Sequence, residues 1–599
     1  MLIRLQQILL FSVLIADALI FPAFFANRAK AQDLNWWTTH ALIKVRPNDA
    51  PPAGNMRGAE LFAGRNEFES FQIVLRSDRH DVEKVDLQIS DLRESSGSSI
   101  ASKNVTIYLE RYLKLEFPSS AEGGTGEWPD PLIPRIDRYA GEKRNAFPFS
   151  LLRSRNQPLW IEVYVPPDTV PGVYSGKATI TAHGLPDISV PIRLTVWDFV
   201  LPSTSSLKTS FGLNGVTALK QHRGRYTDDE ELHDITYLYA KAALWHRISI
   251  HGGNMAPPPF SEGMRLDWSW YDQEVGPFLD GKVFSKDEPL FGARATTVEI
   301  RTHKTTDTNE KKLAYWREWV EHFAEKGWLD RLFYYVWDEP PLQNYPQVAE
   351  RATLARRADA RIRNLVTTSL DDSLKGVINI WAPLINCIDP KPGFGDYCEG
   401  RAVRREVYEA EIEQGKGLWW YQSCASHGCS KGSGGDYFRG WPSYAVDVSA
   451  VANRIMPWLA WKYKVEGELY FSMNEAFAHE IDPWESIYLF GGNGDGTLFY
   501  PGRSKQIGGS TDIPVESIRL KLIREGLEDY EYLVLLSQQR FSDFADKQVS
   551  QMVTRVYQWE RDPEKLYAVR RELGERLERQ RTAERLWIWR VARLLTLSL

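Results

Sequence analysis

The sequence has 599 residues, of which 43% are hydrophobic and 25% charged, and its formal net charge is −6. Because single hydrophobic cores stop growing well below this length, we expect roughly two to four domains. Charges of both signs are mixed without a long basic block, which argues against nucleic acid as a partner. The 22 Trp, 26 Tyr and 26 Phe residues supply flat apolar faces of the kind that stack on sugar rings, although most of them belong in cores.

Residues 1–31 predict an export signal. Arg4 supplies a positive charge ahead of an almost wholly apolar stretch from Ile8 to Phe25, and Ala29-Lys30-Ala31 offers small residues for cleavage. We therefore expect an exported protein, periplasmic or extracellular, that begins at Gln32. The alternative is an uncleaved membrane anchor.

Residues 32–202 predict an antiparallel β-sandwich domain. Runs such as Phe71 to Leu75, Val105 to Leu109 and Trp160 to Val165 are rich in β-branched and aromatic residues. Gly and Pro separate such runs, and helix signals are few. Within this domain, the Gly- and Pro-rich stretch from Gly123 to Pro134 predicts a long loop that could reach a neighbouring site.

After a linker at Leu201 to Ser206, strands alternate with helices over residues 207–510. This repeat predicts a parallel (β/α)8 barrel of the TIM type, with a doubly wound sheet as the second choice. Residues 511–599 predict a helical extension, in which Val515 to Leu536 forms one long amphipathic run. The basic, apolar segment from Leu586 to Leu595 fits either docking against the barrel or a membrane surface.

Four cysteines, Cys387, Cys398, Cys424 and Cys429, lie in one part of the barrel region. Export would permit disulfides, and pairing each cysteine with its sequence neighbour is the simplest of the three possible arrangements. The sequence does not decide among them. A zinc site is the alternative, but the C-x-x-C spacing typical of zinc ligands is missing, so we expect no metal.

One predicted barrel strand runs into two adjacent carboxylates. Phe333 to Trp337 suits a strand that is buried on both faces. Pro340 cannot donate to a ladder, so the strand ends at Asp338 and Glu339. Because barrel enzymes carry their chemistry at the C-terminal ends of strands, both carboxylates are candidate catalytic groups. The alternative is an Asp that caps the next helix beside a solvated Glu.

The stretch from Tyr335 to Pro340, which reads Tyr-Val-Trp-Asp-Glu-Pro, resembles the catalytic strand of glycoside hydrolase family 123 and of the wider group that shares its barrel. Other motifs resemble those of the family and occur in the same order along the chain: Asn66 to Ser70, Met456 to Trp461 and Glu528 to Tyr532. The resemblance implies a sandwich followed by a barrel that removes N-acetyl-β-galactosamine, with the substrate's own acetamido group as nucleophile. The sequence has no glycine-rich phosphate loop after a strand, so we expect no cofactor.

Carried onto this sequence, the resemblance assigns two different roles to the acidic pair. Asp338 would orient and stabilise the acetamido group as it closes on the anomeric carbon. Glu339 would protonate the leaving oxygen and later activate water. Two displacements at one carbon retain its configuration, and substrate-assisted glycosidases need no separate protein nucleophile.

Further candidate sugar-binding residues lie near predicted strand ends: Tyr335, Trp337, Trp381, Trp420, Tyr421, Asn474 and Glu475. Strand alternation predicts that Tyr335 shares a face with Trp337 and Glu339. A core position is the alternative for the tryptophans and Tyr421. We interpret His246 and His251 as structural.

Three functions fit the sequence. The first is an exported retaining exo-β-N-acetylhexosaminidase with galactosamine favoured, which makes a glycan or glycoconjugate its partner. The second is a glycosidase that acts on another cell-wall or exopolysaccharide glycan, with Glu339 as the acid. The third is a non-catalytic carbohydrate-binding envelope protein. None of them requires membrane contact beyond the signal peptide.

Overall fold

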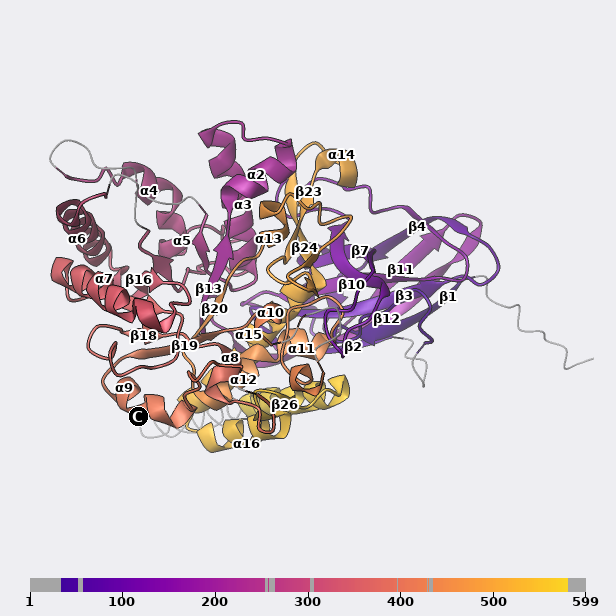
Figure 1. Cartoon of the computed structure of the whole chain (residues 1–599). Coiled ribbons are helices and arrows are strands. Elements are labelled where there is room, and N and C mark those ends of the chain that lie inside the picture. Colours follow the sequence, from indigo (N-terminus) through magenta and orange to yellow (C-terminus); the bar gives the residue numbers. More distant parts are fainter. Residues whose placement is uncertain are drawn as a thin grey trace, which may run out of the picture.

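The computed structural model describes residues 34–51, 58–253, 257, 264–301, 306–395, 397–427, 429 and 435–579. A β-sandwich and a barrel lie side by side, and the C-terminal helices pack beneath them (Figure 1). The expected signal peptide and the segment Leu586 to Leu595 lie outside the described residues. Within those residues, no helix is both long and apolar enough to cross a membrane.

The sandwich consists of two sheets of seven strands each. In sheet order, the first contains β1 (Asn35–His40), β3 (Glu67–Arg76), β10 (Asn156–Val165), β7 (Val105–Leu115), β8 (Gly126–Pro134), β24 (Ile513–Ser517) and β23 (Phe499–Gly502). The second contains β2 (Ala59–Arg65), β12 (Leu185–Val200), β11 (Gly172–Ala182), β4 (Val82–Ile89) and β9 (Phe149–Leu151), with β5 (Leu92–Arg93) and β6 (Ser99–Ile100) beside β11. All pairs are antiparallel except β2 with β12.

The chain returns to the sandwich after it has completed the barrel. Strands β23 and β24 extend the first sheet beyond β8. Strand β24 therefore lies within the region after residue 511 that the sequence predicts to be helical. The sandwich is therefore built from chain segments that precede and follow the barrel.

The long loop expected from Gly123 to Pro134 is largely a strand, which corrects that prediction. Nine of these residues form β8, which pairs with β7 and β24. Its prolines cannot donate to a ladder, but β8 carries one extra residue between Pro129 and Leu132 opposite β7. This bulge accommodates the prolines without ending the strand.

The barrel has eight parallel strands that follow one another in chain order, as predicted. They are β13 (Lys208–Leu213), β14 (Ile250–Gly252), β15 (Val298–Glu299), β16 (Leu332–Trp337), β17 (Arg363–Val366), β18 (Ile380–Trp381), β19 (Gly417–Tyr421) and β20 (Gly467–Tyr470). The sheet order places β14 and β15 at its two ends. There the side chains of Ser249 and Thr296 join the edges, with 2.9 Å between their hydroxyl oxygens.

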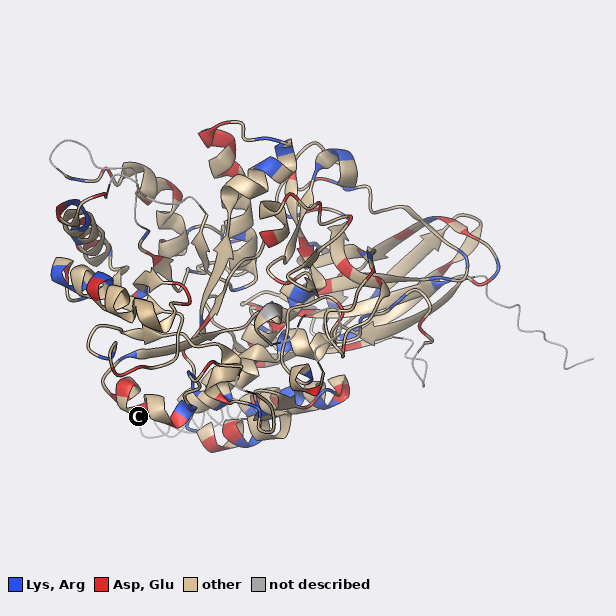
Figure 2. Cartoon of the chain, viewed as in Figure 1, with Lys and Arg blue, Asp and Glu red and all other residues tan. Residues whose placement is uncertain are grey.

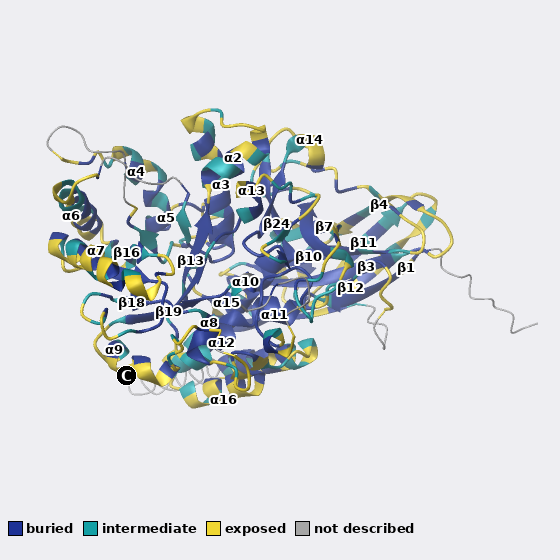
Figure 3. Cartoon of the chain, viewed as in Figure 1, coloured by how far each residue is buried: buried dark blue, intermediate teal, exposed yellow. Residues whose placement is uncertain are grey.

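Helices cover the outside of the barrel. They are α2 (Gly215–Arg223), α3 (Asp229–Trp245), α4 (Ser269–Glu274), α5 (Gly276–Asp280), α6 (Asn309–Glu325), α7 (Tyr345–Ala358), α8 (Ile385–Ile388), α9 (Glu409–Glu413), α10 (Cys424–His427), α11 (Ala450–Arg454), α12 (Met456–Tyr463) and α13 (Glu475–Ala478). Burial is concentrated on the strands and the inner helix faces (Figure 3). Charged residues lie mostly on helices and loops, and the barrel strands contain few of them (Figure 2).

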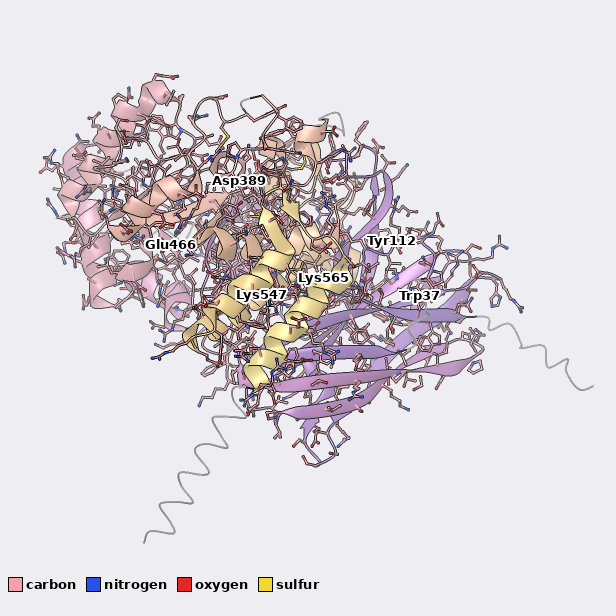
Figure 4. The ribbon with its side chains drawn as sticks, turned by 90° about the horizontal axis from the view of Figure 1, so that it is seen from below. Trp37, Tyr112, Asp389, Glu466, Lys547 and Lys565 are labelled. Carbon is pink, nitrogen blue, oxygen red and sulfur yellow. A yellow bond between two sulfur atoms is a disulfide. The ribbon has the colours of Figure 1, made fainter. Side chains whose placement is uncertain are left out.

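The remaining helices follow β20. They are α14 (Ser504–Ile507), α15 (Ile518–Gln538), α16 (Ser542–Met552) and a helix over residues 563–579. Seen from below, α16 and the 563–579 helix, which carry Lys547 and Lys565, lie across the junction of the barrel and the sandwich (Figure 4). Two short hairpins complete the described chain: β21 (Tyr488–Leu489) with β22 (Gly492–Asn493), and β25 (Val553–Arg555) with β26 (Gln558–Trp559).

Ion pairs inside the protein join α15 to its surroundings. Arg454 contacts Asp529 at 2.7 Å, and Arg570 of the 563–579 helix contacts the same carboxylate at 2.9 Å. Arg570 also pairs with Glu67 of the sandwich. All of these side chains are buried, so the domains meet through a shielded ionic junction.

The structure pairs Cys387 with Cys398 and Cys424 with Cys429. This is the arrangement that the sequence ranks as the simplest. The Cα atoms are 5.7 and 4.9 Å apart, within the range that disulfides require. Each bond closes a loop that follows a barrel strand, β18 in one case and β19 in the other.

Candidate active site

Strand β16 has a bulge just before its acidic pair. Tyr335 pairs with Leu365, but the next pair is Trp337 with Val366, so β16 contains one residue more than β17. The alternation predicted for Tyr335 and Trp337 is therefore wrong. Trp337 packs against the layer between the barrel and its helices, and the Cζ atom of Arg351 lies 4.1 Å from its ring centroid. Bulges of this kind re-aim side chains beside active sites.

Asp338 and Glu339 follow the bulge at the C-terminal end of β16, and both are exposed. Glu339 has a φ of 43°, in the left-handed region, although Pro340 disfavours helical conformations in the residue before it. Such a backbone costs about 1–3 kcal/mol and persists only where neighbouring groups hold it. Here the amide of Glu339 donates to Thr367 Oγ1 at 2.7 Å.

Hydroxyl groups hold both carboxylates. Tyr335 donates to Asp338 Oδ1 at 2.6 Å, and Thr367 donates to the same oxygen at 3.0 Å. Tyr421, at the end of β19, donates to Glu339 Oε1. Burial, together with the neighbouring carboxylates, raises the pKa of both tyrosines well above the ordinary value. Both phenols therefore stay protonated and remain donors at neutral pH.

Three more polar residues lie at the ends of β14 and β15. Burial lowers the pKa of His251 to about 4, against opposing contributions from Ser210 and the charge of Asp338. Burial also raises the pKa of Glu299, and Arg301 opposes this shift with its Nε 3.9 Å from Glu299 Oε2. This end of the barrel therefore contains a neutral imidazole, on which the charge of Asp338 acts, and a third carboxylate on the strand next to β16.

Two domain models of one family match the sequence. The glycoside hydrolase 123 N-terminal domain matches residues 45–182, and the glycoside hydrolase 123 catalytic domain matches residues 291–536. The chain belongs to glycoside hydrolase family 123. The matched catalytic region contains every residue that contacts Asp338 or Glu339 in the site described above.

One solved structure supports the fold of this family 123 protein. A family 123 glycoside hydrolase from Clostridium perfringens, described for glycolipid glycan hydrolysis, aligns over 93% of this chain and 100% of its own, with a TM-score of 0.64 and 14% identity. A Bacteroides ovatus GH5 xyloglucanase aligns over 79% of this chain and 98% of its own, with a TM-score of 0.26 and 11% identity. No curated protein sequence matches significantly.

Tyr335 and Tyr421 are the two predicted sugar-binding residues that the family 123 fold brings to the acidic pair. Trp381 and Trp420 are fully buried between the barrel and its helices, the core position that the sequence left open. Asn474 accepts from the amide of Asn214 at 3.1 Å and donates to its carbonyl at 2.9 Å. It therefore joins the turns after β20 and β13.

Glu475 begins α13 and pairs with His479 at 3.2 Å. His246 is buried, with its Nδ1 2.7 Å from the carbonyl oxygen of Ala242, as a structural residue would be. His251, which the sequence also indicated as structural, lies at the catalytic end of the barrel. In the described part of the chain, no three His, Cys, Asp or Glu side chains form a group that could hold a metal ion.

Sequence reasoning missed Glu299, Arg301 and Thr367. Each lies in or just after a strand too short to give a periodic pattern: β15 has two residues and β17 has four. The signal that could have found them is a polar residue directly after a short β-branched run, as in Leu365-Val366-Thr367.

Proposed function

We propose that this glycoside hydrolase removes β-linked N-acetylhexosamine residues from glycan ends by substrate-assisted catalysis, with N-acetylgalactosamine favoured. One observation carries the proposal: Asp338 and Glu339 are adjacent and exposed at the catalytic end of the barrel, and separate hydroxyl groups hold their carboxylates. Two carboxylates from neighbouring positions on one strand suit one group that orients the acetamide and another that transfers protons.

In the first step, Asp338 accepts the acetamido N–H and turns the carbonyl oxygen toward the anomeric carbon. Its Oδ1 already accepts from Tyr335 and Thr367, which leaves Oδ2 for the substrate. As the carbonyl oxygen bonds to the anomeric carbon, the glycosidic bond breaks and Glu339 gives its proton to the leaving oxygen. The cyclic cation that forms lies against the Asp338 carboxylate.

In the second step, the same residues act in reverse. Glu339, now a carboxylate, takes a proton from a water molecule that attacks the anomeric carbon. The bond from the acetamido oxygen to that carbon breaks, which restores the acetamide and retains the configuration. The hydrogen bond from Tyr421 holds the Glu339 carboxyl group in place for both proton transfers.

Glu299 supports a second candidate function. This largely buried carboxylate ends the strand next to β16. A glycosidase for sugars without an acetamido group could use Glu299 as nucleophile and Glu339 as acid, which is the usual two-carboxylate retaining mechanism. Glu299→Gln would then abolish activity, whereas substrate-assisted catalysis needs no covalent bond to Glu299.

We also infer that the protein is exported and acts on glycans in the periplasm or outside the cell. Two features support this proposal: the apolar N-terminal sequence with its small residues at Ala29 and Ala31, and the cysteine pairs that follow β18 and β19. Disulfides persist in oxidising compartments. Mass spectrometry of protein secreted or released from the periplasm, with a new N-terminus at Gln32, tests this inference.

The deciding experiment compares aryl β-glycosides of N-acetylgalactosamine, N-acetylglucosamine, galactose and glucose. Wild type is measured beside Asp338→Asn, Glu339→Gln and Glu299→Gln. We expect cleavage of the N-acetylated sugars alone, lost in the first two variants and retained in the third. Cleavage confined to galactose or glucose, with loss in Glu299→Gln, would instead establish the two-carboxylate mechanism.

A further inference from the structure

Thr367 connects the two acidic residues. It follows β17 directly and is 3% exposed. Four polar groups surround its hydroxyl oxygen: the amide nitrogen of Glu339 at 2.7 Å, Asp338 Oδ1 at 3.0 Å, the Tyr335 hydroxyl at 3.1 Å and the carbonyl oxygen of Trp337 at 3.4 Å. One side chain thus reaches the backbone of the acid and the carboxylate beside it.

The donor and acceptor roles follow from the number of protons. A threonine hydroxyl has one proton and two lone pairs. The amide of Glu339 can only donate, so Thr367 accepts from it. A carboxylate can only accept, so Thr367 gives its own proton to Asp338. Tyr335 gives its single proton to Asp338 as well, because that contact, at 2.6 Å, is shorter than its contact with Thr367.

This arrangement has two consequences for the reaction. The bond to the Glu339 amide fixes a backbone that has a φ of 43° and would otherwise relax, because Pro340 disfavours it. The bond to Asp338 Oδ1, with that from Tyr335, fixes the plane of the carboxylate. The Thr367 hydroxyl therefore fixes the position of Glu339, the proton donor. It also orients the Asp338 carboxylate so that Oδ2 is left for the acetamido group.

We propose that Thr367 is a positioning residue that sets the geometry of Asp338 and Glu339 together. The inference rests on the proposed function for the role of Asp338, but the role of Glu339 as acid is common to both mechanisms considered above. Tyr335 and Tyr421 each hold one carboxylate, whereas Thr367 acts on both residues.

Matched variants separate these contacts. Thr367→Val keeps the shape of the side chain and removes the hydroxyl, while Thr367→Ser keeps the hydroxyl. Tyr335→Phe removes a donor to Asp338 alone, and Tyr421→Phe removes the donor to Glu339 alone. Thr367→Ala replaces the valine variant if the branched apolar side chain prevents folding.

The experiment measures kcat and KM on aryl β-N-acetylgalactosaminides whose leaving groups range from 4-nitrophenol to phenol. We expect Thr367→Val to lower kcat by about 10- to 100-fold, as for hydrogen bonds to charged groups, with a smaller change in KM. The loss of kcat in Thr367→Val should grow as the leaving group becomes poorer, because proton donation from Glu339 then limits the rate. Tyr335→Phe should lose about the same factor for every leaving group, and Thr367→Ser should restore most of the rate.

Equal rates for Thr367→Val and Thr367→Ser would overturn the proposal, because the hydroxyl would then be irrelevant. If wild type cleaves only sugars that lack an acetamido group, the proposed function is wrong. The same variants, measured on those sugars, then still test whether Thr367 positions Glu339 for proton donation. Crystal structures of wild type and Thr367→Val provide a test independent of activity. We expect Glu339 to leave the left-handed region in the variant, and an unchanged Glu339 backbone would contradict the inference.

Discussion

The protein holds carboxylates in two contrasting ways. At the catalytic end of the barrel, Asp338 and Glu339 are exposed and accept hydrogen bonds from neutral hydroxyl groups. At the junction between sandwich and barrel, buried carboxylates such as Glu162 lie against Arg524 and Lys521, at 2.6 and 2.9 Å. Hydroxyl donors orient a carboxylate without neutralising it, whereas cations fix its charge.

The difference is visible in the pKa values at the junction. Burial alone would raise the pKa of Glu162, but Arg524, Lys521 and Arg138 hold it well below the ordinary value. Burial is likewise outweighed at Glu516, whose pKa falls to about 2 because of Lys521 and other cations. Glu162 and Glu516 therefore stay charged near neutral pH, where their ion pairs stabilise the fold.

The largest expected effect belongs to the acid. Glu339→Gln removes proton donation, which is worth about 10²- to 10⁴-fold in rate, so we expect kcat on phenyl glycosides to fall by that factor. Because Glu339 is exposed, urea unfolding should give a free energy close to that of wild type. A large loss of stability in Glu339→Gln would contradict the contrast between the two regions, because Glu339 would then stabilise the fold as the junction carboxylates do.

The opposite result is expected at the junction. Arg570→Met removes the cation that pairs with buried Glu67, while Asp529 keeps its ion pair with Arg454. This change should cost about 3–5 kcal/mol in the free energy of unfolding. The neighbouring Arg571 is half exposed and pairs with Glu575 on the surface, so Arg571→Met is the matched control. Urea unfolding should separate the two variants clearly, while kcat of the folded fraction stays near wild type in both.

Glu69 makes the junction sensitive to pH. Burial raises the pKa of its carboxyl from 4.5 to about 8, although Arg570 opposes the shift. The folded state therefore binds a proton that the unfolded state releases above about pH 4.5, and the stability that this proton confers is lost as pH rises toward 8. We expect the difference in unfolding free energy between wild type and Glu69→Gln to decline from pH 5 to 8 and then to level off. A constant difference would show that Glu69 is charged throughout.

Sequence patterns were sufficient for the architecture because each layer has a strong signal of its own. Aromatic and β-branched runs such as Trp160 to Val165 mark the sandwich strands. Helices separate the neighbouring barrel strands as expected, except between β17 and β18, which turns alone connect. Asp338 and Glu339 could be located because Pro340, which has no amide to donate, follows them directly at the end of an apolar run.

The rest of the site depends on contacts that local patterns do not contain. Thr367 reaches the acidic pair only because β17 lies beside β16 in a particular register. Trp381 and Trp420 point away from the barrel interior, because alternate residues of a strand face opposite sides. A run that is apolar on both faces, such as Gly417 to Tyr421, does not show which residues face inward. Where β8 and β16 bulge, an extra residue breaks the alternation without any sequence signal.

The bulge in β16 leads to the smallest expected effect. Because the bulge turns Trp337 toward α7, its ring packs against the guanidinium of Arg351. Arg351→Met should then cost about 0.5–1 kcal/mol in unfolding free energy, the size of an exposed cation–π contact, and should leave kcat and KM within about twofold of wild type. Arg356 on the same helix, whose guanidinium binds the carbonyl of Gly376, offers a control that leaves Trp337 untouched. A rise in KM confined to Arg351→Met would indicate that Trp337 binds the sugar. The cation over its ring would then position that ring for the substrate.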